Sequence, residues 1–127
     1  LTIALIDVND FKTVNDTYGH AAGDAMLTMI GTILRDVHEI TAYRIGGDEF
    51  ALLLPNEDAE SIAVRIRKKV AGSKLQFGDQ KLSTSISIGV SRRVDGESIH
   101  SMLCRADDAL YEAKDARRQH LQSVQPV

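Results

Sequence analysis

Hydrophobic and polar positions divide this chain into short strand-like and helix-like segments. Residues 1–6 are a continuous apolar and β-branched run, which is typical of a central strand buried on both faces. Residues 41–45 and 50–54 also predict strands, and residues 82–90 alternate cleanly between apolar and small polar side chains. A further short strand is expected near residues 75–77.

Apolar residues spaced three and four apart predict helices between these strands. Asn9 or Asp10 can cap a short helix that runs to about Thr17, because both side chains accept hydrogen bonds from free helix amides. Longer helices are expected over residues 21–37, 59–70 and about 98–118. The tail after His120 has no periodicity, so residues 120–127 are expected to fray.

The order of these elements predicts an α+β fold with a ferredoxin-like, palm-type split βαβ core. We expect a sheet of about five mainly antiparallel strands, with helices packed on its faces. A right-handed crossover places the first two strands parallel, with the third antiparallel between them. The end of the first strand then lies beside the start of the third, so Asp7 should approach Asp48 and Glu49.

Composition narrows the possible functions. The 127 residues suit one domain, and 43% hydrophobic and 26% charged residues are ordinary for a globular chain. A net charge of −3 without a basic stripe argues against nucleic acid as a partner, and no apolar stretch is long enough for membrane contact by this domain. One cysteine, Cys104, excludes an internal disulfide and fits a reducing, cytoplasmic location. The chain starts at Leu1, directly in a strand pattern, so we expect a domain excised from a longer protein.

Three carboxylates at one sheet edge would repel one another unless a cation lies among them. Mg²⁺ prefers oxygen ligands and is typically held by one or two carboxylates together with substrate phosphates, which Asp7 and Asp48 could supply. Glu49 could complete a second ion site or act on a hydroxyl. Gly46 and Gly47 predict a tight hairpin with positive φ, and their bare backbone would admit a triphosphate. Each residue alone favours a simple strand end or turn, but their combination favours a metal site.

The residues at this turn also carry a family resemblance. Residues 44–50, Arg-Ile-Gly-Gly-Asp-Glu-Phe, resemble the signature of the GGDEF family, the diguanylate cyclases. Residues 7–24 are similar in spacing to the opening block of that family, and residues 106–114 resemble its closing helix. The similarity spans nearly the whole chain, so residues 1–127 are identified as one GGDEF domain.

The resemblance implies that two GTP molecules are joined into cyclic di-GMP with release of pyrophosphate. Each subunit of an antiparallel homodimer would bind one GTP. Asp7, the carbonyl of Val8 and Asp48 would hold Mg²⁺, with Mn²⁺ as an alternative ion. Asp48 and Glu49 would be the catalytic residues, Glu49 by serving a second ion or by deprotonating the attacking 3′-hydroxyl.

Substrate contacts follow from the same resemblance. Gly46, Gly47 and Lys12 would lie against phosphates, and so would Lys114 and Arg118, which are four residues apart on one helix face. The simpler alternative for that pair is a solvated basic face.

Asn15 and Asp24 would read guanine. A carboxylate at Asp24 can accept from guanine N1–H and the 2-amino group together, which adenine cannot match. The simpler alternatives are a helix C-cap for Asn15 and a helix-dipole partner for Asp24.

Several positions depart from the family pattern. The Asp-x-Leu-Thr-Gly-Leu-x-Asn-Arg block that usually precedes the first strand is missing, and Asn9 replaces a common Asp. Arg117 and Gln119 stand where Gly and Asn are frequent, which bears on the pose of Arg118. Residues 37–40, Val-His-Glu-Ile, replace the inhibitory Arg-x-x-Asp motif, so we expect no inhibitory site and no product inhibition through it.

A non-catalytic alternative belongs to a different functional class. The domain could bind GTP and regulate an attached domain, such as an EAL phosphodiesterase. Degenerate family members of this kind usually lose the signature carboxylates, whereas Asp48 and Glu49 are intact. The sequence therefore favours catalysis, in a parent protein that carries an attached sensor or output domain.

Overall fold

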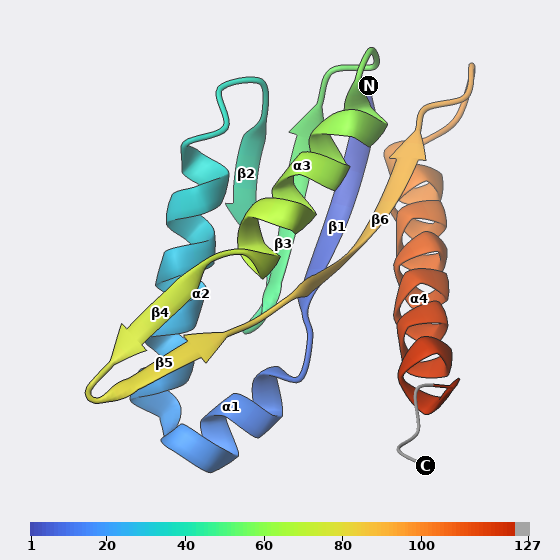
Figure 1. Cartoon of the computed structure of the whole chain (residues 1–127). Coiled ribbons are helices and arrows are strands. Elements are labelled where there is room, and N and C mark those ends of the chain that lie inside the picture. Colours follow the sequence, from blue (N-terminus) through green and yellow to red (C-terminus); the bar gives the residue numbers. More distant parts are fainter. Residues whose placement is uncertain (124–127) are drawn as a thin grey trace.

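The computed structural model describes residues 1–123 of the chain (Figure 1). Six strands and four helices alternate along these residues, close to the predicted order. They are β1 (Thr2–Val8), α1 (Phe11–Tyr18), α2 (His20–Arg35), β2 (Thr41–Arg44), β3 (Glu49–Leu54), α3 (Ala59–Ala71), β4 (Lys74–Phe77), β5 (Gln80–Ser83), β6 (Ile86–Arg92) and α4 (Ile99–Ser123).

The main sheet has the strand order β2-β3-β1-β6, and every neighbouring pair is antiparallel. Strand β3 therefore lies between β1 and β2, which run parallel to each other, as the split βαβ arrangement predicts. In the β1–β3 register Asp7 stands opposite Glu49, and in the β1–β6 register it stands opposite Ser87. The predicted meeting of the end of β1 with the start of β3 is confirmed.

The sheet has four strands among the described residues, so the expectation of about five was wrong. Strands β4 and β5 form a separate two-stranded hairpin, which projects across α2 in Figure 1. The predicted continuous strand over residues 82–90 is interrupted at Thr84 and Ser85. At this interruption, the backbone amide of Asn9 donates to the Ser85 carbonyl, and the Asn9 side-chain amide donates to the Ser85 hydroxyl.

Helices cover both faces of the sheet. Ala4, Ile6 and Leu52 point to the face that packs against α2 and α3, whereas Leu5 packs with Ala106 and Leu110 of α4. All seven residues of β1 are buried. The continuous apolar pattern at the start of the chain therefore marks a strand covered on both faces.

Helix α4 lies close against β6 because Gly89 has no side chain. A Cβ at Gly89 would stand 2.2 Å from the amide nitrogen of Leu110 and 2.3 Å from the carbonyl oxygen of Ala106. Both distances are far inside van der Waals contact, so this approach requires glycine. The contact also fixes the position of Lys114, one helical turn beyond Leu110.

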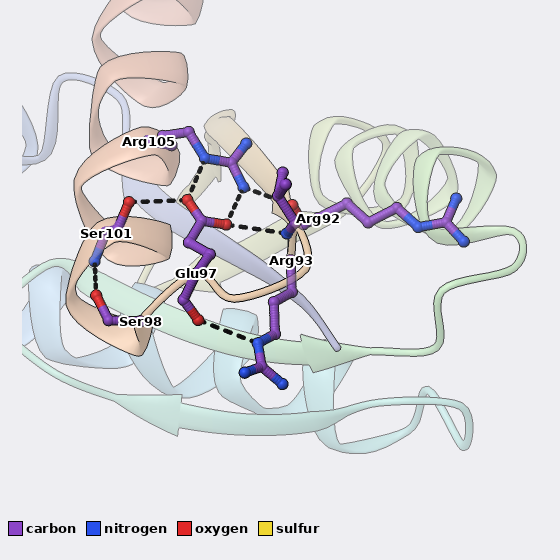
Figure 2. A network of polar contacts seen from close by, with 7 residues as sticks. Arg92, Arg93, Glu97, Ser98, Ser101 and Arg105 are labelled. Atoms are coloured by element: carbon purple, nitrogen blue, oxygen red, sulfur yellow. Dashed lines mark hydrogen bonds and ion pairs between the residues drawn. The ribbon is translucent and has the colours of Figure 1, made fainter.

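A polar network holds the beginning of α4 to the end of β6 (Figure 2). Glu97 accepts hydrogen bonds from the side chains of Arg105 and Ser101 and from the amide of Val94, and Arg105 also donates to the carbonyl of Arg92. The hydrogen bond from Arg105 is the main reason that the pKa of Glu97 falls to about 2. Both ends of the β6–α4 connection are thus anchored.

The C-terminal helix extends further than predicted. Helix α4 continues to Ser123, so fraying from residue 120 was wrong for residues 120–123, while residues 124–127 lie outside the described residues. Arg117 is a good helix former, which agrees with the longer helix. Within residues 1–123, no helix combines the length and the apolar composition that crossing a bilayer requires.

Candidate active site

Most of the predicted phosphate and metal residues meet at one end of the sheet, where β1 ends beside the β2–β3 connection and the C-terminal half of α4 (Figure 1). A cavity of about 220 Å³ opens there. Its lining includes six predicted site residues, and Asn9, Asp10, Phe11 and Arg117 complete the wall. The six are Asp7, Val8, Lys12, Asp48, Lys114 and Arg118.

Two carboxylates dominate this cavity. Asp7 is buried, its Oδ2 atom accepts from the ammonium of Lys114, and its Oδ1 atom is buried without a hydrogen-bond partner. Burial raises the pKa of Asp48, and the negative charge of Asp7 raises it further, while Lys114 opposes the shift. The two carboxylates thus repel each other, and Asp7 Oδ1 has no hydrogen-bond donor. A bound cation would reduce the repulsion and use this oxygen.

The oxygen donors at this position fit Mg²⁺. Two carboxylates together with substrate phosphates are the usual magnesium environment, and the backbone of Val8 lies beside them, with its amide 3.1 Å from the carbonyl oxygen of Asp48. The described residues include no group of three His, Cys, Asp or Glu side chains suited to a metal. A magnesium ion here would therefore depend on the Asp7–Asp48 pair and on the nucleotide.

The third carboxylate, Glu49, lies at the same strand end but outside the cavity, so its place in a three-carboxylate site stays a prediction. Its Cα stands opposite that of Asp7, but its side chain is exposed and does not line the cavity. The Glu49 carboxylate instead lies over Gly46, with Oε2 3.2 Å from the position of a Cβ there. The strand register predicts the backbone position of Glu49 correctly. It does not determine the direction in which the longer Glu49 side chain extends.

The β2–β3 connection differs from the tight hairpin that Gly46 and Gly47 predicted. The connection spans four residues, as the sequence predicted, but neither glycine has a positive φ. The amides of Ile45 and Gly46 both point to the carbonyl of Glu49, at 3.0 and 3.4 Å. The requirement for positive φ was therefore wrong.

The second predicted role of these glycines, a bare backbone that admits phosphate, stays a prediction, because neither glycine lines the cavity. No atom lies within 4 Å of a Cβ placed at Gly47, so the backbone there is open to an approaching group. Arg44 holds the connection from one side, donating to the carbonyl oxygens of Gly46 at 3.2 Å and Gly47 at 2.7 Å. Arg44 thus supports the turn through both glycine carbonyls.

Asn15 and Asp24 lie apart from this cavity, at the junction of α1 and α2. Asn15 Oδ1 rests over Gly23, where a Cβ would stand only 1.9 Å away, and it is buried without a hydrogen-bond partner. Gly19 rather than Asn15 is the C-cap of α1, and Asp24 lies beyond the first turn of α2. Both simpler interpretations of these residues were therefore wrong, and an unused acceptor remains beside Gly23.

The basic pair on α4 is also more than a solvated face. Lys114 is only 31% exposed at its side chain and pairs with Asp7, 107 positions away in sequence. Arg118 is exposed and lines the same cavity. Both cations of the predicted pair thus face the carboxylates.

Sequence reasoning missed three polar features around the site. Asn9 is buried, donates to Ser85 and accepts from Ser87. An ionised aspartate at this position could not donate the bond to Ser85. Arg44, two residues before the glycines, donates to both of their carbonyls, a supporting role that its place in the signature does not predict. The Arg117–Asp10 ion pair joins two positions whose partnership no local pattern could indicate.

The stretch that replaces the inhibitory motif has its own contact. Glu39 accepts from Arg65 of α3 at 2.6 Å between exposed side chains, and this hydrogen bond lowers the pKa of Glu39. The carboxylate in residues 37–40 is thus already paired with a cation.

A family model described as "Diguanylate cyclase, GGDEF domain" matches residues 1–120. This chain belongs to the GGDEF family. Diguanylate cyclase A of Treponema denticola is 44% identical over 124 residues, which cover 93% of this chain and 33% of that protein.

Solved structures of the family share the fold. Diguanylate cyclase SiaD from Pseudomonas aeruginosa, solved with its activator SiaC, has a TM-score of 0.85 at 38% identity, over 91% of this chain and 46% of that chain. The GGDEF domain of DgcB from Caulobacter crescentus, solved with c-di-GMP, has a TM-score of 0.83 at 35% identity, over 91% and 70%. The chain spans about a third of the length of the curated relatives it matches, such as diguanylate cyclase A and, at 37%, VdcA of Vibrio cholerae.

Proposed function

We propose that this domain condenses two GTP molecules into cyclic di-GMP and releases pyrophosphate. The observation that carries the proposal is the Asp7–Asp48 pair in the wall of a cavity that Lys12, Lys114 and Arg118 also line. Carboxylates for a metal and cations for phosphates are the two requirements of phosphoryl-type transfer. The names of the relatives, and the c-di-GMP bound to the DgcB domain, support the same reaction.

Each side chain has a role in this proposal. Asp7, Asp48 and the carbonyl of Val8 hold Mg²⁺, which when bound neutralises phosphate charge and aligns the reacting oxygens. Glu49 lies outside the cavity, free to serve the second ion or the 3′-hydroxyl of the nucleotide on the facing subunit. Each subunit supplies half of the reaction, so a homodimer is part of the proposal.

The triphosphate would lie between α1 and α4. Lys12 lines the cavity from α1, and Lys114 and Arg118 line it from α4. The open backbone at Gly47 would offer a further phosphate contact. Lys114 pairs with Asp7 in the structure. In the complex, the metal cation would replace Lys114 as the partner of Asp7, and a phosphate would replace Asp7 as the partner of Lys114. The Asp7 charge is thus paired before the substrate arrives.

Guanine would be read at the α1–α2 junction. Asn15 offers a buried acceptor without a partner, and Asp24 is exposed on the adjacent helix. Guanine supplies N1–H and a 2-amino group as matching donors, whereas adenine would leave a carboxylate unpaired. The proposed substrate is therefore GTP on both subunits.

The alternative is a GTP-binding regulatory domain without turnover, which controls a domain attached in the parent protein. The intact Asp7, Asp48 and Glu49 favour catalysis over this alternative. We also propose that the domain is part of a longer cytoplasmic protein that carries an attached sensor or output domain.

Turnover by the full-length parent decides between the two functions. The parent is incubated with GTP and Mg²⁺, and chromatography measures cyclic di-GMP. We expect product from the wild type and none from Glu49→Gln, which should still bind GTP. Saturable GTP binding without product from a dimeric wild type would favour the regulatory function, and full activity of Glu49→Gln would remove the role given to that residue.

A further inference from the structure

An ion pair between α4 and the residue before α1 spans the proposed nucleotide cavity. Arg117 Nη2 lies 2.8 Å from Asp10 Oδ2, and both residues line the same cavity as Asp7 and Asp48. The two partners are 107 positions apart in sequence. The pair therefore ties the loop after β1 to the far wall of the cavity.

Asp10 has the backbone and side-chain arrangement that such a tie requires. It is the N-cap of α1, yet its side chain makes no cap hydrogen bond, and its backbone is left-handed, with φ 56° and ψ 29°. A positive φ is uncommon outside glycine, although Asp and Asn tolerate it best. The carboxylate is thus turned away from the helix amides and bonds Arg117 instead.

The tied loop carries residues that the proposed reaction needs. It follows Asp7 and Val8 and leads directly into Lys12, while Lys114 and Arg118 stand on the helix that bears Arg117. We propose that Arg117 is a positioning residue of the nucleotide site, which fixes the β1–α1 loop against α4 and so sets the separation of the two cationic walls. This inference rests on the proposed binding of magnesium and GTP.

Global stability is not the expected purpose of this pair. The Asp10 side chain is 62% exposed and the Arg117 side chain 31% exposed, and ion pairs at such exposure contribute little to folding. Loss of the pair should therefore loosen the loop without lowering the melting temperature appreciably.

A direct phosphate contact by Arg117 makes a different prediction. In that case Asp10 would compete with the nucleotide for the guanidinium, and Asp10→Asn would leave GTP affinity unchanged or increase it. Under the positioning role, Asp10→Asn and Arg117→Gln both weaken binding, because each removes the ion pair that joins the loop to α4. Asparagine is the suitable replacement, since it tolerates the left-handed backbone and removes only the charge.

The test uses the full-length parent protein as wild type, Arg117→Gln, Asp10→Asn and the double variant. Hydrogen exchange of peptides covering residues 8–14 is followed without nucleotide, and the Kd for Mg²⁺–GTP is measured by calorimetry. We expect faster exchange in each variant and a two- to tenfold weaker Kd, with the double variant no weaker than Arg117→Gln. Arg65→Gln is the matched control, because it breaks another exposed ion pair away from the cavity and should change neither quantity.

Several results would overturn the positioning role. These are unchanged exchange, unchanged affinity, tighter binding by Asp10→Asn, or additive losses in the double variant. A wild type that does not bind Mg²⁺–GTP would contradict the proposed function and with it the role of Arg117 in nucleotide binding, while the exchange rates would still decide whether Arg117 ties the loop.

Discussion

Replacing Gly89 by alanine tests how the fold places α4 against the active site. The added Cβ would stand 2.2 Å from the Leu110 nitrogen and 2.3 Å from the Ala106 carbonyl oxygen. Both contacts are with backbone, so no side-chain rotation can relieve them. The helix and β6 must separate by about 1 Å to reach ordinary contact distances.

The expected cost lies at the upper end of that for overpacked cores, about 3 kcal/mol. A domain of this size loses roughly 4 °C of melting temperature per kcal/mol, so Gly89→Ala should melt about 12 °C lower. Because Lys114 moves with α4, turnover should also fall at least about tenfold at temperatures where the variant is folded.

Gly31→Ala is the matched control for this experiment. The same substitution in the interior of α2 meets no atom within 4 Å, so only the helix preference of alanine remains. That preference should stabilise the domain by about 0.5–1 kcal/mol. Thermal and denaturant unfolding of both variants measures the difference, and a Gly89→Ala variant as stable as Gly31→Ala would refute the close approach of α4.

Further predictions concern the base site, pH and the product. Gly23→Ala should displace the Asn15 amide rather than backbone, weakening GTP binding about five- to tenfold in calorimetry with little loss of stability; unchanged affinity would count against Asn15 as a base contact. The pKa of Glu97 is about 2 in the folded protein against an ordinary 4.5, so its contribution to stability is complete above pH 4.5 and is lost as the pH falls toward 2. Wild type should therefore lose more stability over that interval than Glu97→Gln, and parallel unfolding curves would disprove it. Cyclic di-GMP should not inhibit through residues 37–40, and tight saturable product binding that depends on Arg35 would contradict this.

The sequence predicted backbone positions better than side-chain directions. Apolar runs and periodicity located β1, β3 and the helices, since burial imposes those patterns directly. Topology then placed Asp7 beside the start of β3, because strand order fixes which chain ends meet. The direction of the Glu49 side chain lay beyond this reasoning.

Contacts between distant segments account for the remaining differences. The alternating pattern predicted one strand through Thr84 and Ser85. The hydrogen bonds from Asn9 to Ser85 interrupt it, and the local sequence pattern does not indicate them. Lys114 lies in the cavity with Asp7 and Asp48, but its pairing with Asp7 depends on how closely α4 packs at Gly89. Such tertiary contacts have no local signature.

The central claim is that magnesium and GTP bind between the end of β1 and α4. A crystal structure of the domain with Mn²⁺ and a non-reactive GTP analogue tests it most directly, because anomalous scattering locates the metal. We predict a manganese peak between Asp7 and Asp48, with the triphosphate beside Lys12 and Lys114. Nucleotide and metal bound elsewhere, for instance in the larger cavity of about 510 Å³ between α2 and β2, would contradict the account.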